Sequence, residues 1–222
     1  MSESARGGFA SRFLRWGKGG EGRGAREERG EPLTTKAFGR FLAYLTAREG
    51  PVLLDLGPVV GQNVAFFGER LGCKLFVEDL FVDLDRAAKE GRGAELPDLL
   101  RGRITREDAS VDGVLVWDLF DHLDRPAAAV LGEQLTRVLR PGGVLLGFFA
   151  SGAPTPGASP THMRYQVVDE KTITQRPAPA ARPRQPALNN RDIARAFSGL
   201  TVSESFLMRS QVREILFRKP QR

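Results

Sequence analysis

The sequence predicts an α/β fold in which a mostly parallel β-sheet carries helices on both faces. Continuous apolar runs are typical of parallel strands buried on both sides, and they occur at residues 51–57, 73–77, 111–117 and 144–149. Segments with helical spacing alternate with these runs, at residues 63–71, 82–90 and 125–139. Two last runs, 201–208 and 212–217, predict an antiparallel pair at the sheet edge.

Local signals mark where several helices begin. A first helix is predicted from Thr34 or Thr35, either of which can serve as its N-cap, to about Glu49. Asn63 is the predicted N-cap of helix 63–71, and Asn190 that of a short helix over 191–198. Residues 91–110 show no regular pattern, and residues 164–175 predict a short hairpin or a single strand.

The chain divides by composition into an arm and one domain. Residues 1–31 are rich in Gly, Arg and Glu without a sustained period, which predicts a disordered N-terminal arm. Residues 32–222 form the predicted domain, with an insertion at about 150–189 in which residues 150–160 are rich in Gly, Ser and Pro and residues 176–188 hold four prolines. We therefore expect one α/β domain rather than two.

Cysteine and hydropathy bound the class of protein. Cys73 is the single cysteine, so neither an intrachain disulfide nor a cysteine-rich zinc site is expected, and we predict no metal. No run of about 18 apolar residues occurs, and the N-terminus lacks the pattern of a secretory signal. These features predict a cytoplasmic protein without a membrane span.

Positive charge is concentrated near the C-terminus. The chain carries a net charge of +6, and residues 161–222 contribute 12 basic and 5 acidic residues, or +7. A basic surface attracts nucleic acid, so RNA is one partner to consider. Codon bias explains the same excess, because arginine outnumbers lysine 27 to 6.

Three strand ends carry the residues that point to chemistry. In a parallel sheet the carboxyl ends of the strands share one edge, and ligands bind there where the strand order reverses. This places three segments along one crevice: Asp55–Gly61, Glu78 with Asp79, and Asp118–His122. Gly57 permits close backbone approach to a ligand, and a carboxylate at residue 78 or 79 can accept both hydroxyl protons of a ribose.

The motifs then resemble one family. VLLDLGPVVGQN resembles the glycine-rich first motif of class I methyltransferases, and residues 110–149, with LRPGG as the most specific piece, resemble the fourth to fifth strands of a type 11-like methyltransferase domain. REILFRK is similar to that family's last strand. The resemblance implies a Rossmann-like, seven-stranded, mostly parallel sheet with an antiparallel last strand, and S-adenosyl-L-methionine as cofactor.

The resemblance also implies roles for matching residues. Asp55 and Gly57 would shape the pocket for the methionine part of the cofactor, and Gly61 would let the loop meet the next helix. Glu78 or Asp79 would hold the ribose, with Glu78 preferred because it directly follows the strand, while Asp79 can equally cap a helix.

The methyl end of the cofactor has its own set of residues. Asp118 and Leu119 would lie near the transferred methyl group. The catalytic residues stay unassigned, with Asp118 and His122 as candidates: His122 has a pKa suited to a general base, and a surface position at a helix start is the alternative.

Two positions depart from the family pattern. Val59 replaces the middle glycine of the first motif, and its side chain would crowd the cofactor unless the loop follows another path. The acidic residue that often binds adenine after the third strand has only Asp108 as a stand-in.

Several functions stay open at this stage. The first is an active methyltransferase of a small molecule, with RNA or protein as alternative acceptors. The second is a binding protein of the same fold with a degenerate cofactor site, for which Val59 is the reason. A nicotinamide-dependent oxidoreductase is disfavoured because residues 57–62 lack the G-x-G-x-x-G pattern.

Overall fold

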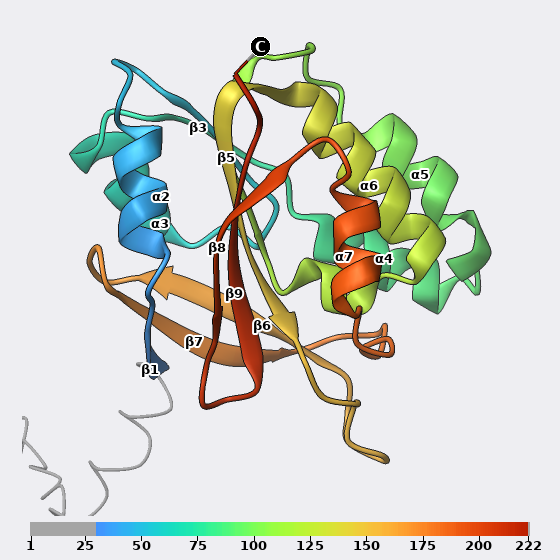
Figure 1. Cartoon of the computed structure of the whole chain (residues 1–222). Helices are drawn as coiled ribbons and strands as arrows, with labels where there is room; N and C mark the ends of the chain where they lie inside the picture. Colours follow the sequence, from blue (N-terminus) through green and yellow to red (C-terminus); the bar gives the residue numbers. More distant parts are fainter. Residues whose placement is uncertain (1–29, 222) are drawn as a thin grey trace, which may run out of the picture.

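A computed structural model describes residues 30–221 of the chain. The predicted arm over residues 1–31 therefore lies almost entirely outside the described residues, apart from the last two positions, where Glu31 opens a strand. Figure 1 shows a central sheet between two layers of helices, with a second, smaller sheet below it.

The central sheet has six strands in the order β3-β2-β4-β5-β9-β8. The strands β2, β3, β4 and β5 pair in parallel, and β9 and β8 join antiparallel. Their bounds are β2 Val52–Asp55, β3 Lys74–Val77, β4 Val111–Trp117, β5 Leu139–Ala150, β8 Thr201–Leu207 and β9 Val212–Arg218. The predicted mostly parallel sheet with an antiparallel edge is confirmed.

The predicted count of seven strands is wrong, because the sheet ends at β3 on one side. Residues 91–110, which would supply a strand beyond β3, instead fold as the 3₁₀ turn η2 (Gly93–Glu95) and helix α5 (Leu96–Arg103). Pro97 sits in the first turn of α5, where its missing N–H costs nothing, and Leu96 and Leu100 turn inward one helical turn apart. A helix therefore closes this side of the domain.

Helices cover both faces of the central sheet and bury one apolar cluster on each (Figure 1). One face carries α2 (Phe38–Leu45) and α3 (Gly61–Val64), which continues as the π-helical η1 (Ala65–Arg70). The other carries α4 (Leu80–Lys89), α5, α6 (Arg125–Val138) and α7 (Asn190–Ala196), with the short η3 (Leu119–His122) after β4. Strands buried on both faces explain why their sequences read as unbroken apolar runs.

Helix α2 takes its N-terminal cap from the far end of the chain. Neither Thr34 nor Thr35 caps it, since Thr34 belongs to a strand and the Thr35 hydroxyl donates to the carbonyl of Lys171. Instead Glu214 of β9, fully buried, accepts a hydrogen bond from the Lys36 amide at 2.7 Å. A carboxylate at a helix N-terminus satisfies free N–H groups, so this contact fixes α2 to the sheet.

A second sheet is built from two distant parts of the chain. Its strands are β1 (Glu31–Thr34), β6 (Thr161–Val167) and β7 (Thr172–Pro179), all antiparallel, in the order β1-β7-β6. The β6–β7 hairpin lies within the predicted insertion, and alternation along β6 points Met163, Tyr165 and Val167 toward the apolar cluster around α2. This sheet covers the carboxyl ends of β2 and β4.

No helix within residues 30–221 combines the length and the apolar character needed to cross a lipid bilayer. In the same range, no three His, Cys, Asp or Glu side chains come together in a way that would hold a metal ion.

Candidate active site at the strand crossover

The central sheet reverses its strand order between β2 and β4. Asp55 ends β2 and Trp117 ends β4, and the two strands are hydrogen-bonded neighbours. Ligands of open α/β sheets bind outside the carboxyl ends of the strands at such a crossover. The structure therefore places the predicted first motif at the position where a ligand site is expected.

The Asp55 carboxylate is occupied by partners from its own chain. Asp55 is 2% exposed, and its Oδ1 accepts hydrogen bonds from the Gly57 amide at 2.9 Å and from the indole Nε1 of Trp117 at 2.6 Å. Burial raises the pKa of Asp55 to about 6, although both hydrogen bonds act in the opposite direction. Oδ1 is therefore satisfied without a ligand, while no hydrogen bond among the described residues reaches Oδ2.

Gly57 is needed here because an indole ring packs directly against it. A Cβ atom built on Gly57 would lie 2.6 Å from Cδ1 of Trp117, closer than non-bonded atoms approach. Trp117 adopts a positive φ of 48°, an uncommon conformation for a residue other than glycine, and one that aims its side chain at the crossover. The space above Gly57 is thus filled by Trp117.

Tyr165 of the second sheet closes the crossover from above. Its ring stacks on the Trp117 indole with 5.0 Å between centroids and 8° between planes, and Phe148 of β5 stacks beside both. Burial raises the pKa of the Tyr165 hydroxyl well above its ordinary value. Aromatic pairs of this kind add stability beyond the area that they bury.

Two polar side chains fasten strand β6 over the crossover. Asn63 of α3, 2% exposed, donates to the Tyr165 carbonyl at 2.9 Å and accepts from the Val167 amide at 2.8 Å. Asp118 Oδ2 accepts from the Met163 amide at 3.0 Å. The insertion is therefore held on the site by hydrogen bonds at both ends of β6.

The two predicted ribose ligands have partners as well. Glu78, after β3, forms an ion pair with Arg103 of α5, which also binds Asp83. Asp79 is the N-cap of α4, where it accepts from the Phe81 amide at 3.1 Å, in agreement with the capping alternative. Both residues lie beyond β3 as the sequence predicts, but neither is a free carboxylate.

The residues predicted near the methyl group are buried in and after β4. Asp118 and His122 are 8% and 1% exposed, and Leu119 is fully buried. His122 is therefore not the surface residue of the alternative reading, and its Nε2 has no hydrogen-bond partner among the described residues. Burial lowers the pKa of His122 to about 4, so the imidazole is neutral at physiological pH.

Three other residues of the sequence analysis lie outside the crossover. Gly61 begins α3 and has open space around its Cα. Val59 is 66% exposed, so its side chain does not fill the hollow above Gly57. Asp108 forms a surface ion pair with Arg137.

The residues as folded do not leave room for an adenosyl group above Gly57. Trp117 and Tyr165 occupy that place, and Asp55 Oδ1, the Glu78 carboxylate and Asp118 Oδ2 are bonded within the chain. Asp118 Oδ1 is buried without a hydrogen-bond partner among residues 30–221. A cofactor would enter only after the aromatic pair separates. The residues predicted to hold the cofactor therefore lie at the carboxyl ends of the strands, as expected, but other side chains of the chain cover them.

Sequence reasoning missed the residues that close the site. The sequence predicts Trp117 as a core residue and places Tyr165 in the insertion that would cover the pocket, but it does not predict that the two stack. It predicts Asn63 as a helix cap, whereas the structure has Asn63 bound to β6. One local signal was visible: the alternation of Met163, Tyr165 and Val167 marks an inward-facing strand. The sequence predicts that the insertion covers the pocket, but not which side chains of the strand enter it.

The buried Asp118 carboxyl predicts a pH-dependent stability. Burial, with a smaller effect from Asp121, raises its pKa to about 7. The folded state then keeps a proton that the unfolded chain releases near pH 4, so folding loses stability as pH rises from 4 to 7. Asp118→Asn keeps an acceptor for Met163 and removes this loss. Relative to the native protein, its free energy of unfolding should rise by roughly 2–4 kcal/mol between pH 4 and pH 8.

Chemical denaturation at several pH values measures this difference. Glu49→Gln, at an exposed position whose side chain forms no ion pair or hydrogen bond among residues 30–221, is the matched control, and its stability should follow the same pH profile as the native protein. Parallel curves for Asp118→Asn and the native protein would show that Asp118 is ionised at neutral pH.

Comparison with known proteins gives a match over the crossover region. Residues 54–147, from β2 to β5, match the family model described as "Methyltransferase domain". No curated protein matches the sequence.

Solved structures of similar fold include three from different organisms. One is 1,6-didemethyltoxoflavin-N1-methyltransferase of Burkholderia thailandensis, with bound 1,6-didemethyltoxoflavin and S-adenosylhomocysteine: identity is 17%, coverage 83% of this chain and 79% of that chain, and TM-score 0.47. The PH0226 protein of Pyrococcus horikoshii has 15% identity, coverage of 82% and 87%, and TM-score 0.49. A SAM-dependent methyltransferase of Methanosarcina mazei has 12% identity, coverage of 86% and 100%, and TM-score 0.46.

Proposed function

We propose that the chain is a class I, S-adenosyl-L-methionine-dependent methyltransferase of a small molecule. The observation that carries the proposal is the family match over residues 54–147, which contains the whole crossover between β2 and β4. In an open arrangement the cofactor contacts would be Asp55, Gly57, Gly61, Glu78, Asp79, Asp118 and Leu119. Residues 32–222 would act as one domain, in the cytoplasm, with the insertion at 150–189 as its cover.

Entry of the cofactor requires the cover to move. Tyr165 must leave Trp117, and the indole must then swing off Gly57 to free the Asp55 carboxylate. Strand β6 is held here by a small number of hydrogen bonds, from Asn63 and Asp118, so a local opening does not require the central sheet to unfold. Closure of this kind is a common way for enzymes to exclude water from a site.

Calorimetric titration with S-adenosylhomocysteine tests the proposal without knowledge of the acceptor. The native protein should bind, and Tyr165→Leu should bind roughly tenfold more tightly, about 1.4 kcal/mol, because less stacking must be broken. Tyr44→Leu, the other tyrosine of the chain, is the matched control and should leave the affinity unchanged. In a Trp16→Phe background, Trp117 is the single tryptophan, and its fluorescence should change as the ligand binds.

A non-catalytic binding protein of the same fold is the second candidate. The observation in its favour is Trp117, which takes the place above Gly57 and bonds to Asp55. If millimolar S-adenosylhomocysteine binds neither the native protein nor folded Tyr165→Leu, this second function replaces the first. If Tyr165→Leu does not fold, Trp117→Phe takes its place in this titration, because it also weakens the stacking between residues 117 and 165.

An RNA acceptor is less favoured, since part of the basic C-terminal region serves the fold. Arg182 donates to the His122 carbonyl, Arg213 to the Leu188 carbonyl, and Lys219 to the carbonyls of Thr136 and Leu139. A gel shift at low salt decides this point: salt-sensitive retardation of RNA would support an RNA acceptor.

A further inference from the structure

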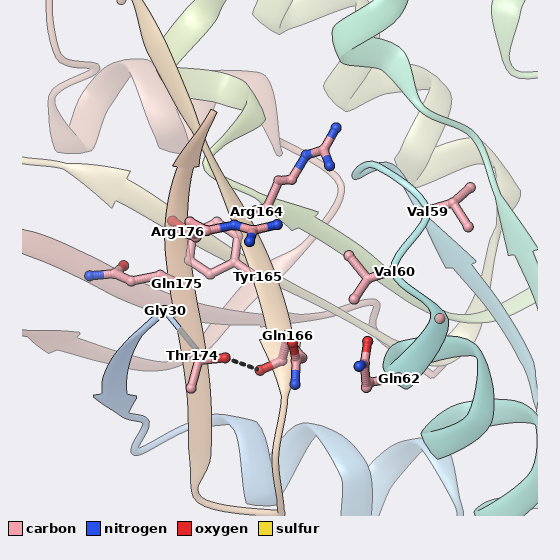
Figure 2. Close-up of a pocket in the computed structure, with 11 residues that line it drawn as sticks. Gly30, Val59, Val60, Gln62, Arg164, Tyr165, Gln166, Thr174, Gln175 and Arg176 are labelled. Atoms are coloured by element: carbon pink, nitrogen blue, oxygen red, sulfur yellow. Dashed lines mark hydrogen bonds between the residues drawn. The ribbon is translucent and has the colours of Figure 1, made fainter. Parts of the chain in front are cut away.

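A second hollow lies on the outward side of the β6–β7 hairpin, beside the loop that leads into α3 (Figure 2). It has a volume of about 300 Å³. Successive residues of a strand point to opposite faces, so Arg164 and Gln166 face this hollow while Tyr165 packs against Trp117 behind them. The hollow therefore borders the closed crossover, because Tyr165 belongs to its lining and Gly61, a proposed cofactor contact, lies in its wall.

Two arginines give the hollow its charge. Arg164 of β6 and Arg176 of β7 are direct cross-strand partners, and both point toward the Val59–Val60 loop in Figure 2. Like charges directly opposite one another on a hairpin destabilise it. Within residues 30–221, neither guanidinium group has a carboxylate within ion-pair distance, so the chain described here does not offset this repulsion.

The nearest acidic group does not change this conclusion. Asp79 feels the positive charge of Arg164, which opposes the rise that burial causes in the pKa of Asp79, but the Asp79 carboxylate is already bound to the Phe81 amide. The remaining lining adds neutral donors, namely the amide groups of Gln62 and Gln166, while the hydroxyl of Thr174 donates to the Gln166 carbonyl at 3.5 Å. Val60 supplies an apolar wall.

We propose that this hollow binds the phosphate group of a small phosphorylated molecule between Arg164 and Arg176. Two guanidinium groups match the two negative charges of a phosphate monoester, and each can donate two parallel hydrogen bonds. A phosphate monoester has three terminal oxygens to accept hydrogen bonds, whereas a carboxylate has two. Gln62 and Gln166 supply donors for the additional oxygen. The binding relieves the cross-strand repulsion, and it does not depend on the proposed methyltransferase function.

Inorganic phosphate is the probe for this site. In low-salt buffer at pH 8, millimolar phosphate should raise the melting temperature of the native protein, and calorimetry should give a single site. Arg164→Gln and Arg176→Gln should each bind phosphate about tenfold more weakly. Arg209→Gln, at an exposed arginine in the β8–β9 turn outside the hollow, is the matched control and should behave as the native protein.

The same variants give a second measurement with the opposite sign. Without phosphate, Arg164→Gln and Arg176→Gln should melt at or above the native temperature, because each removes one member of a like-charge pair. If phosphate raises the melting temperature of the native protein and of all three arginine variants equally, the proposal is overturned. Phosphate would then be attracted by the overall positive charge alone.

Discussion

Gly132→Ala is expected to lower the free energy of unfolding by about 3 kcal/mol, near the upper end for overpacking a core. Gly132 lies on α6 where the end of α7 crosses it, and a Cβ atom there would stand 2.0 Å from the Ala196 carbonyl oxygen. The obstacle is backbone, so no side-chain rotation can relieve it. The gain in helix propensity from Gly to Ala, about 1 kcal/mol, is too small to compensate.

Gly102→Ala is the control for this prediction, because it makes the same change in a helix without the clash. Gly102 lies on α5 with nothing within 4 Å of the added Cβ atom. Its stability should therefore rise, by about 0.5–1 kcal/mol. Chemical denaturation should show a lower free energy of unfolding for Gly132→Ala and a higher one for Gly102→Ala than for the native protein. Equal effects would mean that α6 and α7 do not pack as closely as described.

Asn63→Ala is expected to cost about 2–5 kcal/mol, because it leaves two buried backbone groups without partners. These groups are the Tyr165 carbonyl and the Val167 amide, both on β6. The loss is local to the cover, so hydrogen exchange at the Val167 amide should accelerate far more than exchange in the central strands. Mass spectrometry of exchanged peptides from 161–179 reports this difference.

Gln62→Ala provides the comparison for the Asn63 experiment. It removes a neighbouring amide side chain that is exposed and makes no hydrogen bond to β6 among the described residues. Exchange at Val167 should be unchanged in this variant. Slow exchange at Val167 in Asn63→Ala would show that the aromatic stacking of Tyr165, rather than Asn63, holds the cover in place.

The elements of the fold were predictable where local physics decides them. The run Val111–Trp117 is apolar throughout because β4 is buried on both faces, and the structure has a strand with those bounds. The missing seventh strand shows the opposite case. Leu96 and Leu100 fit helical spacing only weakly among charged neighbours, and the choice between strand and helix was made by packing of α5 against α6.

The sequence predicts where the site lies in the fold, but not that aromatic side chains close it. Asp55 and Gly57 lie at the crossover because a strand followed by a glycine loop must end there. Their partner, Trp117, comes from 62 residues further along the chain, and Tyr165 from further still. Contacts of this range depend on the positive φ of Trp117 and on the register of β6, neither of which leaves a local mark in the sequence.

The pairing of β1 with β7 has a practical consequence for work with this protein. Glu31–Thr34 is hydrogen-bonded to the strand that carries Arg176, so the start of the described chain is part of the cover (Figure 1). The C-terminal strand β9 belongs to the central sheet instead. An affinity tag fused ahead of residue 30 would therefore be attached to the sheet that we propose must move for a ligand to enter. A tag after residue 222 would instead follow the central sheet. Ligand titrations with the two constructions are expected to differ, and the C-terminal fusion is the better starting point.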